Sequence, residues 1–154
     1  MLAIIDVDKF QLKRELRVNI NVGQLVDPTY SPADKKLYAL HVAPHGISFC
    51  NFTTSLVTVD INSGQVQTIW STNGPAPLVG RSLAVNPLQP GVVYVGMAGP
   101  AGRMCTYETQ IVRVQPNFPT RYSEIYITHN GQGSIDLHVD PRGTALYSVL
   151  DADG

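Results

Sequence analysis

The amino-acid sequence predicts an all-β protein in which one small antiparallel sheet is repeated along the chain. The first observation is a strand that occurs twice: CNFTTSLVTVD at residues 50–60 and CTYETQIVRVQ at residues 105–115 match at six positions without a gap. The second is a turn followed by a tyrosine-containing strand, which recurs at a similar spacing. The third is the near absence of helix signals. Self-similarity at a fixed period is typical of proteins built from repeated supersecondary units.

The repeated strand occurs a third time near the start of the chain. LAIID at residues 2–6 aligns with residues 56–60 and 111–115, at spacings of 54 and 55 residues. Each copy is followed by turn-forming residues and a second apolar run, which is the pattern of two strands joined by a hairpin. Residues 8–16 also have a helix-like pattern, but their position in the repeat predicts a hairpin, which we prefer over local propensity.

A second element recurs between these hairpins. It consists of Val, then Asp or Asn, then Pro, a turn and a strand with a tyrosine, and it starts at residues 26, 85 and 139. Its tyrosines are Tyr38, Tyr94 and Tyr147, spaced by 56 and 53 residues. The Asx side chain can accept hydrogen bonds from the turn backbone, and the proline fixes φ and ends the first strand. We therefore expect Asp27, Asn86 and Asp140 to cap equivalent turns.

The elements combine into a unit of four short antiparallel strands, which is typical of a β-propeller blade. We expect one partial propeller domain over residues 1–154, with about three blade units and half-blades at both termini. Its pieces are an outer hairpin at 2–20, blades at 23–72 and 80–128, and an inner strand pair at 134–150. Such a chain is an excised piece of a larger propeller, or half of a six-bladed propeller that a second copy completes. The remaining alternative is a small barrel or three-bladed form that folds alone.

Three segments resemble the YVTN-type propeller repeats, which read roughly DP-x-G-x-x-LYV followed by V-x-V-ID-x-x-x-x-x-V. They are VDPRGTALYSV at 139–149, VNPLQPGVVYVG at 85–96 and LAIIDVDKFQLKRELRV at 2–18. The resemblance covers nearly the whole chain and implies a propeller fold. It also implies an enzyme as one alternative, because YVTN-like and related propellers include lactone hydrolases and quinoprotein dehydrogenase subunits.

Charge and composition restrict the classes of partner. The formal net charge is -1, and Lys and Arg do not cluster. Nucleic-acid phosphates require clustered positive charge, so we expect no nucleic-acid partner. No apolar stretch approaches the roughly 20 residues of a membrane-spanning helix. Cys50 and Cys105 occupy equivalent repeat positions, which usually lie too far apart for a disulfide; we expect two small core residues, with a disulfide or a metal pair as the alternative.

Candidate functional residues gather on the third inner strand, SIDLHVD at residues 134–140. Side chains alternate between the faces of a strand, so Asp136, His138 and Asp140 share one face, near the mouth of the expected channel. Arg81 is the fourth candidate for ligand binding. Carboxylate and imidazole groups can hold Zn²⁺ or Ca²⁺, but a spacing of about 6–7 Å is too wide to chelate one ion without a neighbouring blade. We therefore expect turn capping and a polar channel lining, with no metal or cofactor.

The sequence contains no G-x-S-x-G, P-loop, CxxC or HExxH motif, which are the common signatures of catalytic and phosphate-binding sites. We therefore predict a non-catalytic binding module that takes a small polar ligand or a protein at the channel mouth or rim. An enzyme acting through Asp136, His138 and Asp140 is one alternative. A structural subunit whose edge strands complete a larger assembly, as a homodimer or with another chain, is the other.

Overall fold

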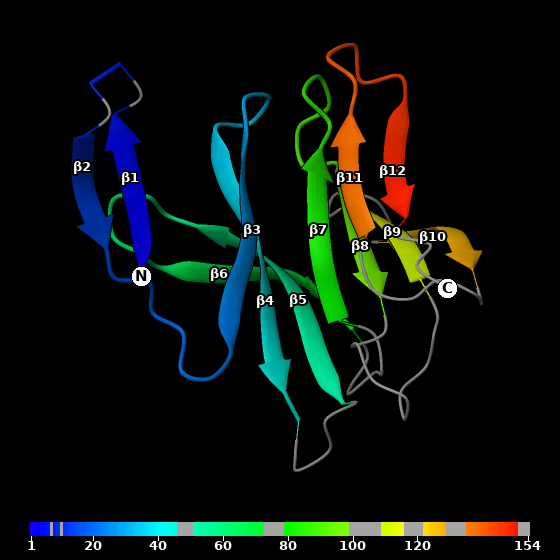
Figure 1. Ribbon diagram of the computed structural model, residues 1–154, viewed down its shortest axis with the longest axis horizontal. Coiled ribbons are helices and arrows are strands. Elements are labelled where there is room, and N and C mark those ends of the chain that lie inside the picture. Colours follow the sequence, from blue (N-terminus) through cyan, green and yellow to red (C-terminus); the bar gives the residue numbers. More distant parts are fainter. Residues whose placement is uncertain are drawn as a thin grey trace.

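The computed structural model describes residues 1–6, 8–9, 11–45, 51–72, 79–98, 109–115, 122–128 and 135–150, with the backbone alone described for 122–128 and 150. All regular elements in these residues are β-strands, which confirms the all-β prediction (Figure 1). They are β1 (Leu2–Asp6), β2 (Gln11–Leu16), β3 (Gln24–Ser31), β4 (Lys36–Pro44), β5 (Phe52–Val59), β6 (Val66–Ser71), β7 (Val79–Val85), β8 (Val93–Ala98), β9 (Thr109–Val114), β10 (Tyr122–Thr128), β11 (Ile135–Val139) and β12 (Leu146–Leu150). No helix occurs in this part of the chain, so none of it could cross a membrane as an apolar helix.

The strands form antiparallel sheets that follow one another in chain order (Figure 1). β1 pairs with β2, and β11 pairs with β12, each as a two-stranded sheet. Between them lie two four-stranded sheets, β3-β4-β5-β6 and β7-β8-β9-β10, in which each strand bonds to its neighbour in sequence. Among the described strands, no sheet closes on itself. The strand β2 occupies the segment where helical periodicity and the repeat disagreed, so the repeat was the better guide there.

The tyrosines of the repeat occupy corresponding positions. Tyr38 of β4 lies directly opposite Thr58 of β5, and Tyr94 of β8 lies directly opposite Arg113 of β9. Thr58 and Arg113 occupy the same position in the repeated strand, the third residue of the aligned segments 56–60 and 111–115. Tyr147 lies on β12, the second strand of its own sheet. The register of the hydrogen-bonded pairs therefore repeats along the chain together with the sequence.

The hydrophobic core lies between successive sheets rather than within one of them. The largest cluster joins the facing sides of the two four-stranded sheets and includes Tyr38, Leu40, Leu56, Trp70, Val93 and Val112. A second cluster packs β11 against β7, β8 and β9 through Ile135, Leu137 and Val139. A third packs Leu2 and the segment after β2 onto the other side of the β3–β6 sheet. Backbone contact continues this packing, since the Asn19 amide donates to the Gly64 carbonyl at 3.2 Å.

One of the predicted turns is wrong. Asp27 and Pro28 were expected to cap a turn and end a strand, but β3 continues through both of them. The register shifts between Val26 and Thr29, and Asp27 has a φ of 49°. This is a β-bulge, in which the extra residue need not pair, so a proline without an N–H group is tolerated there.

The other two Asx residues cap turns as predicted. Asn86 Oδ1 accepts hydrogen bonds from the backbone N–H groups of Leu88 and Gln89 at 3.0 and 3.2 Å. Asp140 Oδ1 accepts from the backbone N–H groups of Thr144 and Ala145 at 2.6 and 2.8 Å. Asp27 is thus free of this local role, and its carboxylate is directed to the next sheet.

Candidate functional site

The first strands of three successive sheets, β3, β7 and β11, lie side by side (Figure 1). Polar side chains connect them. Asp27 Oδ2 on β3 accepts a hydrogen bond from the backbone N–H of Leu83 on β7, at 2.6 Å. Ser82 Oγ on β7 accepts one from the backbone N–H of Leu137 on β11, at 3.0 Å. These partners are separated by 56 and 55 residues, so each bond spans one repeat. A side chain of one sheet therefore satisfies a backbone donor of the next sheet twice in succession.

The same three strands border a depression of about 340 Å³, which we call the three-strand groove. Its polar side chains are Asp27 and Thr29 from β3 and Asp136 and His138 from β11. The other described residues of its lining are apolar and come from β7, β11 and the prolines that follow these strands. A concave site with an apolar lining and a few convergent polar groups is the usual form of a small-ligand site.

The structure brings together two of the four candidate residues named from the sequence. Asp136 and His138 are exposed and alternate with buried residues along β11, as strand periodicity requires. Asp136 Oδ1 also accepts a hydrogen bond from Ser82 Oγ at 3.3 Å, which fixes the carboxylate beside β7. Both side chains therefore face the three-strand groove from one edge.

Asp140 and Arg81 lie outside the lining of this groove. Both carboxylate oxygens of Asp140 are engaged in its turn, since Thr144 Oγ1 donates to Oδ2 at 3.0 Å in addition to the two backbone donors. The hydrogen bonds from the turn, that of the Ala145 amide above all, lower the pKa of Asp140 below its ordinary value. Arg81 is exposed on β7.

Asp27 and Thr29 were not assigned to this site from the sequence. Both lie at the bulge of β3, where the strand was expected to have ended. The available signal was the length of the segment between Pro28 and Tyr38, which exceeds the corresponding segment between Pro87 and Tyr94. Those additional residues allow β3 to continue past the proline before the chain turns.

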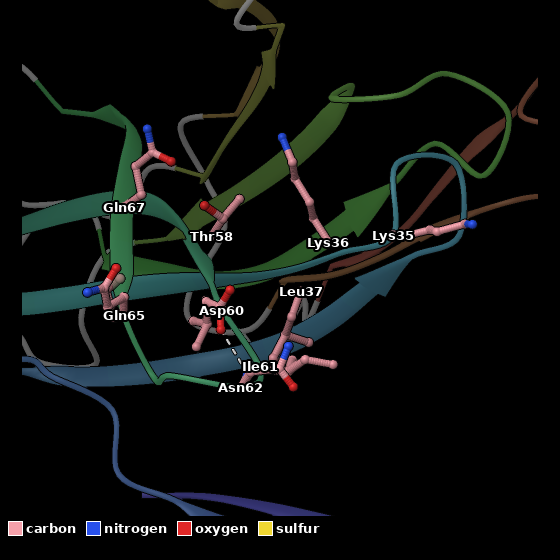
Figure 2. Close-up of a pocket in the computed structure, with 11 residues that line it drawn as sticks. Lys35, Lys36, Leu37, Thr58, Asp60, Ile61, Asn62, Gln65 and Gln67 are labelled. Carbon is pink, nitrogen blue, oxygen red and sulfur yellow. Dashed lines mark hydrogen bonds between the residues drawn. The ribbon is translucent and has the colours of Figure 1, made fainter.

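A larger depression of about 630 Å³ lies at the end of the β3–β6 sheet, beside the β5–β6 hairpin (Figure 2). The one carboxylate among its described residues, Asp60, accepts hydrogen bonds from the backbone N–H groups of Asn62 and Ser63 at 2.8 and 2.7 Å. These bonds, that of Ser63 first, lower the pKa of Asp60. Figure 2 shows Lys35 extending away from the group around Asp60. Because its carboxylate already caps the hairpin, this depression is better explained as the polar rim of a turn.

The described residues contain no group of three or more His, Cys, Asp or Glu side chains that could hold a metal ion. His41 lies on β4, and its Nε2 donates to the Val22 carbonyl at 2.7 Å, so this ring has a structural partner. Cys50, Cys105 and His129 lie outside the described residues, and the predictions made for the two cysteines stay predictions. Comparison of the chain with protein families, with characterised proteins and with solved structures gave no significant match.

Proposed function

We propose that the chain forms part of a β-propeller and acts as a non-catalytic binding module, with the three-strand groove as its ligand site. The observation that carries the proposal is the pair of bonds from Leu83 to Asp27 and from Leu137 to Ser82, each spanning one repeat. In a propeller the first strand of every blade lines the central channel and contacts the next blade in the same way. A succession of sheets joined through β3, β7 and β11 has the contacts that such a ring requires.

The charge of the three-strand groove favours a ligand that carries a positive group. Among the described residues that line it are two carboxylates, Asp27 and Asp136, and no Lys or Arg. The Asp27 carboxylate is committed to Leu83, so Asp136 and the adjacent His138 are the groups best placed to contact a ligand. Low-dielectric walls strengthen the attraction between a groove of one sign and a ligand of the opposite sign.

The lining supports binding better than catalysis. Its described residues include no Ser, Cys or Lys that could act as a nucleophile. Asp136 and His138 are two residues apart on one strand, about 6–7 Å along it, which is too far for a direct carboxylate–imidazole pair of the catalytic kind. A positioned polar pair on an apolar floor is sufficient to orient a bound cationic group.

The experiment is a titration of the protein with N-acetyl-arginine amide, followed by the imidazole carbon–proton signals in NMR. We expect the His138 signal to move saturably at millimolar ligand, while the His41 signal stays in place because its ring is held to Val22. The neutral N-acetyl-glutamine amide should produce little change. Asp136→Asn should weaken the binding at least threefold, and Asp8→Asn, a matched loss of one charge on an exposed turn, should leave it unchanged.

Equal shifts in Asp136→Asn and in the unaltered protein would refute the assignment of the site, as would the absence of any saturable shift. The enzyme alternative predicts a different result. Elemental analysis of the purified protein would then find a stoichiometric metal that His138→Ala removes, and binding of the arginine analogue would depend on that metal.

A further inference from the structure

We propose that β12 pairs with β1 of a second copy of this chain, so that two two-stranded sheets combine into one four-stranded sheet. This inference goes beyond the proposed function and does not depend on the three-strand groove. It rests on the correspondence between the two-stranded sheets and the halves of the four-stranded ones. The partner surface is the open backbone edge of each strand.

The β1–β2 pair corresponds to the third and fourth strands of a complete sheet. Asp6 Oδ1 accepts hydrogen bonds from the backbone N–H groups two and three residues later, at 3.1 and 3.2 Å. Asp60 Oδ1 makes the same two contacts in the β5–β6 hairpin. In both hairpins the residue before the aspartate lies in the strand that precedes the turn, so Ile5 is the counterpart of Val59.

The β11–β12 pair corresponds to the first and second strands. Val139 pairs with Leu146 across its turn, as Val85 pairs with Val93 across the β7–β8 turn. In each of these sheets the tyrosine follows directly after that pair, so Tyr147 is the counterpart of Tyr94. Within the described residues β12 bonds to β11 alone and β1 to β2 alone, whereas β4 and β5 bond to a strand on both sides.

The exposure of apolar side chains marks the same two half-sheets. Large apolar residues of β1 and β12 are exposed to solvent, although the residues that correspond to them in the complete β3–β6 sheet are buried. The exposed fractions are 59% for Ile5 against 4% for Val59, 59% for Tyr147 against 2% for Tyr38, and 69% for Val149 against 0% for Leu40. The buried counterparts pack between successive sheets, so a second copy would cover these side chains with its neighbouring sheet and would also pair with the open strand edge.

A second copy is the occupant that fits both edges. The β1–β2 and β11–β12 pairs lie at opposite ends of the series of sheets (Figure 1), and each supplies the half-sheet that the other lacks. Two copies joined by two such contacts form a closed ring with a two-fold axis. That ring has two complete sheets from each copy and two shared ones, six in all, within the 4–8 blades typical of propellers.

The complete sheets also define the register of the new pair. Tyr38 lies opposite Thr58, whose counterpart on β1 is Ile4. We therefore expect Tyr147 to lie opposite Ile4 of the second copy. The next pair along the ladder is then Ser148 opposite Ala3, and both of these side chains are exposed in one copy.

The test is cysteine cross-linking at this pair, after Cys50 and Cys105 have been replaced by alanine. A mixture of the single variants Ala3→Cys and Ser148→Cys should give a covalent species of twice 16.8 kDa under mild oxidation, because directly opposed strand residues lie within disulfide range. The matched control mixes Ala3→Cys with Arg142→Cys, an exposed turn residue outside β12, and should give at least tenfold less product.

Two further measurements keep the proposal testable. Sedimentation of the unaltered chain at micromolar concentration should show the dimer mass, and Tyr147→Lys should shift it to monomer with at least a tenfold weaker dimerisation constant. A stable monomer of the unaltered chain would overturn the proposal. So would cross-linking of a double Ala3→Cys, Ser148→Cys variant within one chain, or equal cross-linking in the Arg142→Cys control. The cross-link reports on the Ala3–Ser148 pair, and the arginine-analogue titration reports on Asp136 and His138, so either can fail alone.

Discussion

Replacing Asp27 by alanine should weaken the contact between the two four-stranded sheets. The Asp27 carboxylate accepts the backbone N–H of Leu83 at 2.6 Å, and Leu83 is only 3% exposed. A buried N–H left without an acceptor costs about 1–3 kcal/mol. Asp27 also has a φ of 49°, which aspartate tolerates better than alanine does, so the substitution should cost about 1 kcal/mol more. The free energy of unfolding should therefore fall by about 2–4 kcal/mol.

Two matched substitutions separate these contributions. Asp27→Asn keeps an oxygen acceptor and a residue suited to positive φ, so it should cost less than about 1 kcal/mol. Asp27→Gly removes the backbone strain but leaves Leu83 without its acceptor, and should give an intermediate loss. Urea unfolding followed by circular dichroism gives the free energies, and the alanine variant should melt roughly 4–16 °C lower. A loss of less than about 0.5 kcal/mol in Asp27→Ala, or an equal loss in Asp27→Asn and Asp27→Ala, would contradict this role of the Asp27 carboxylate.

Three other substitutions have defined outcomes. Gly143→Ala should destabilise by about 2–4 kcal/mol in urea unfolding, because its φ is 65° and a Cβ would lie 2.5 Å from Asn86 Oδ1; an unchanged midpoint would contradict this. Burial and the Asp34 carboxylate, which accepts the Tyr38 hydroxyl at 2.6 Å, raise the pKa of Tyr38. A raised folded pKa means that stability is lost as pH rises above about 10. Tyr38→Phe should therefore lower the free energy of unfolding by about 1.5–3 kcal/mol at pH 7. It should also reduce the fall of that free energy between pH 9 and pH 11 (about one unit either side of 10). An unchanged pH dependence in this range would contradict the prediction. The pKa of Asp60 is lowered in the folded state, so its contribution to folding stability is present above the unfolded-state pKa of about 3.9 and is lost as pH falls further. Asp60→Asn should therefore flatten the decrease of the unfolding free energy at acid pH.

Strand positions could be predicted from the sequence because they repeat. The helix-like segment at β2 shows this most clearly, since its local pattern is ambiguous and only its distance from the β5–β6 hairpin identifies it as a strand. Asn86 and Asp140 were also predictable, because an Asx cap is a local interaction over two to five residues.

The role of Asp27 could not be predicted in the same way. Its Val-Asp-Pro sequence matches the capping element at residues 139–141, but a bulge places it inside a strand rather than at the end of one. The partner that then receives its carboxylate is 56 residues away on another sheet. Local sequence specifies that an aspartate tolerates positive φ; it does not specify which distant amide will lie beside it.

The candidate site could also be predicted only in part. The alternation of Asp136 and His138 with apolar neighbours on β11 identified two exposed polar groups on one face. That Thr29 lies across from them depends on how β3 and β11 are placed on either side of β7, which is a property of packing between sheets. Arg81 is also exposed on a first strand, but the register shifts there, and Ser82 is the residue of β7 that bonds to β11.

Asp136 has a position in the sheets that connects the groove with the proposed assembly. It lies opposite Val149 on β12, and Ser82 lies opposite Gly96 on β8; both opposing residues are two positions after their tyrosine. Asp136 is therefore the counterpart of Ser82, which accepts a backbone N–H from the first strand of the next sheet. In a ring of two copies, the next first strand after β11 belongs to the second copy.

We therefore expect the Asp136 side chain to stabilise the dimer as a hydrogen-bond acceptor and not through its negative charge. Asp136→Ala should weaken the dimer by at least threefold in sedimentation, whereas Asp136→Asn, which keeps an oxygen acceptor, should leave the dimer intact. Binding of the arginine analogue should be weakened by both substitutions, because both remove the negative charge. If Asp136→Asn dissociates the dimer as strongly as Asp136→Ala does, the residue acts there through charge, and its correspondence with Ser82 does not extend to the contact between copies.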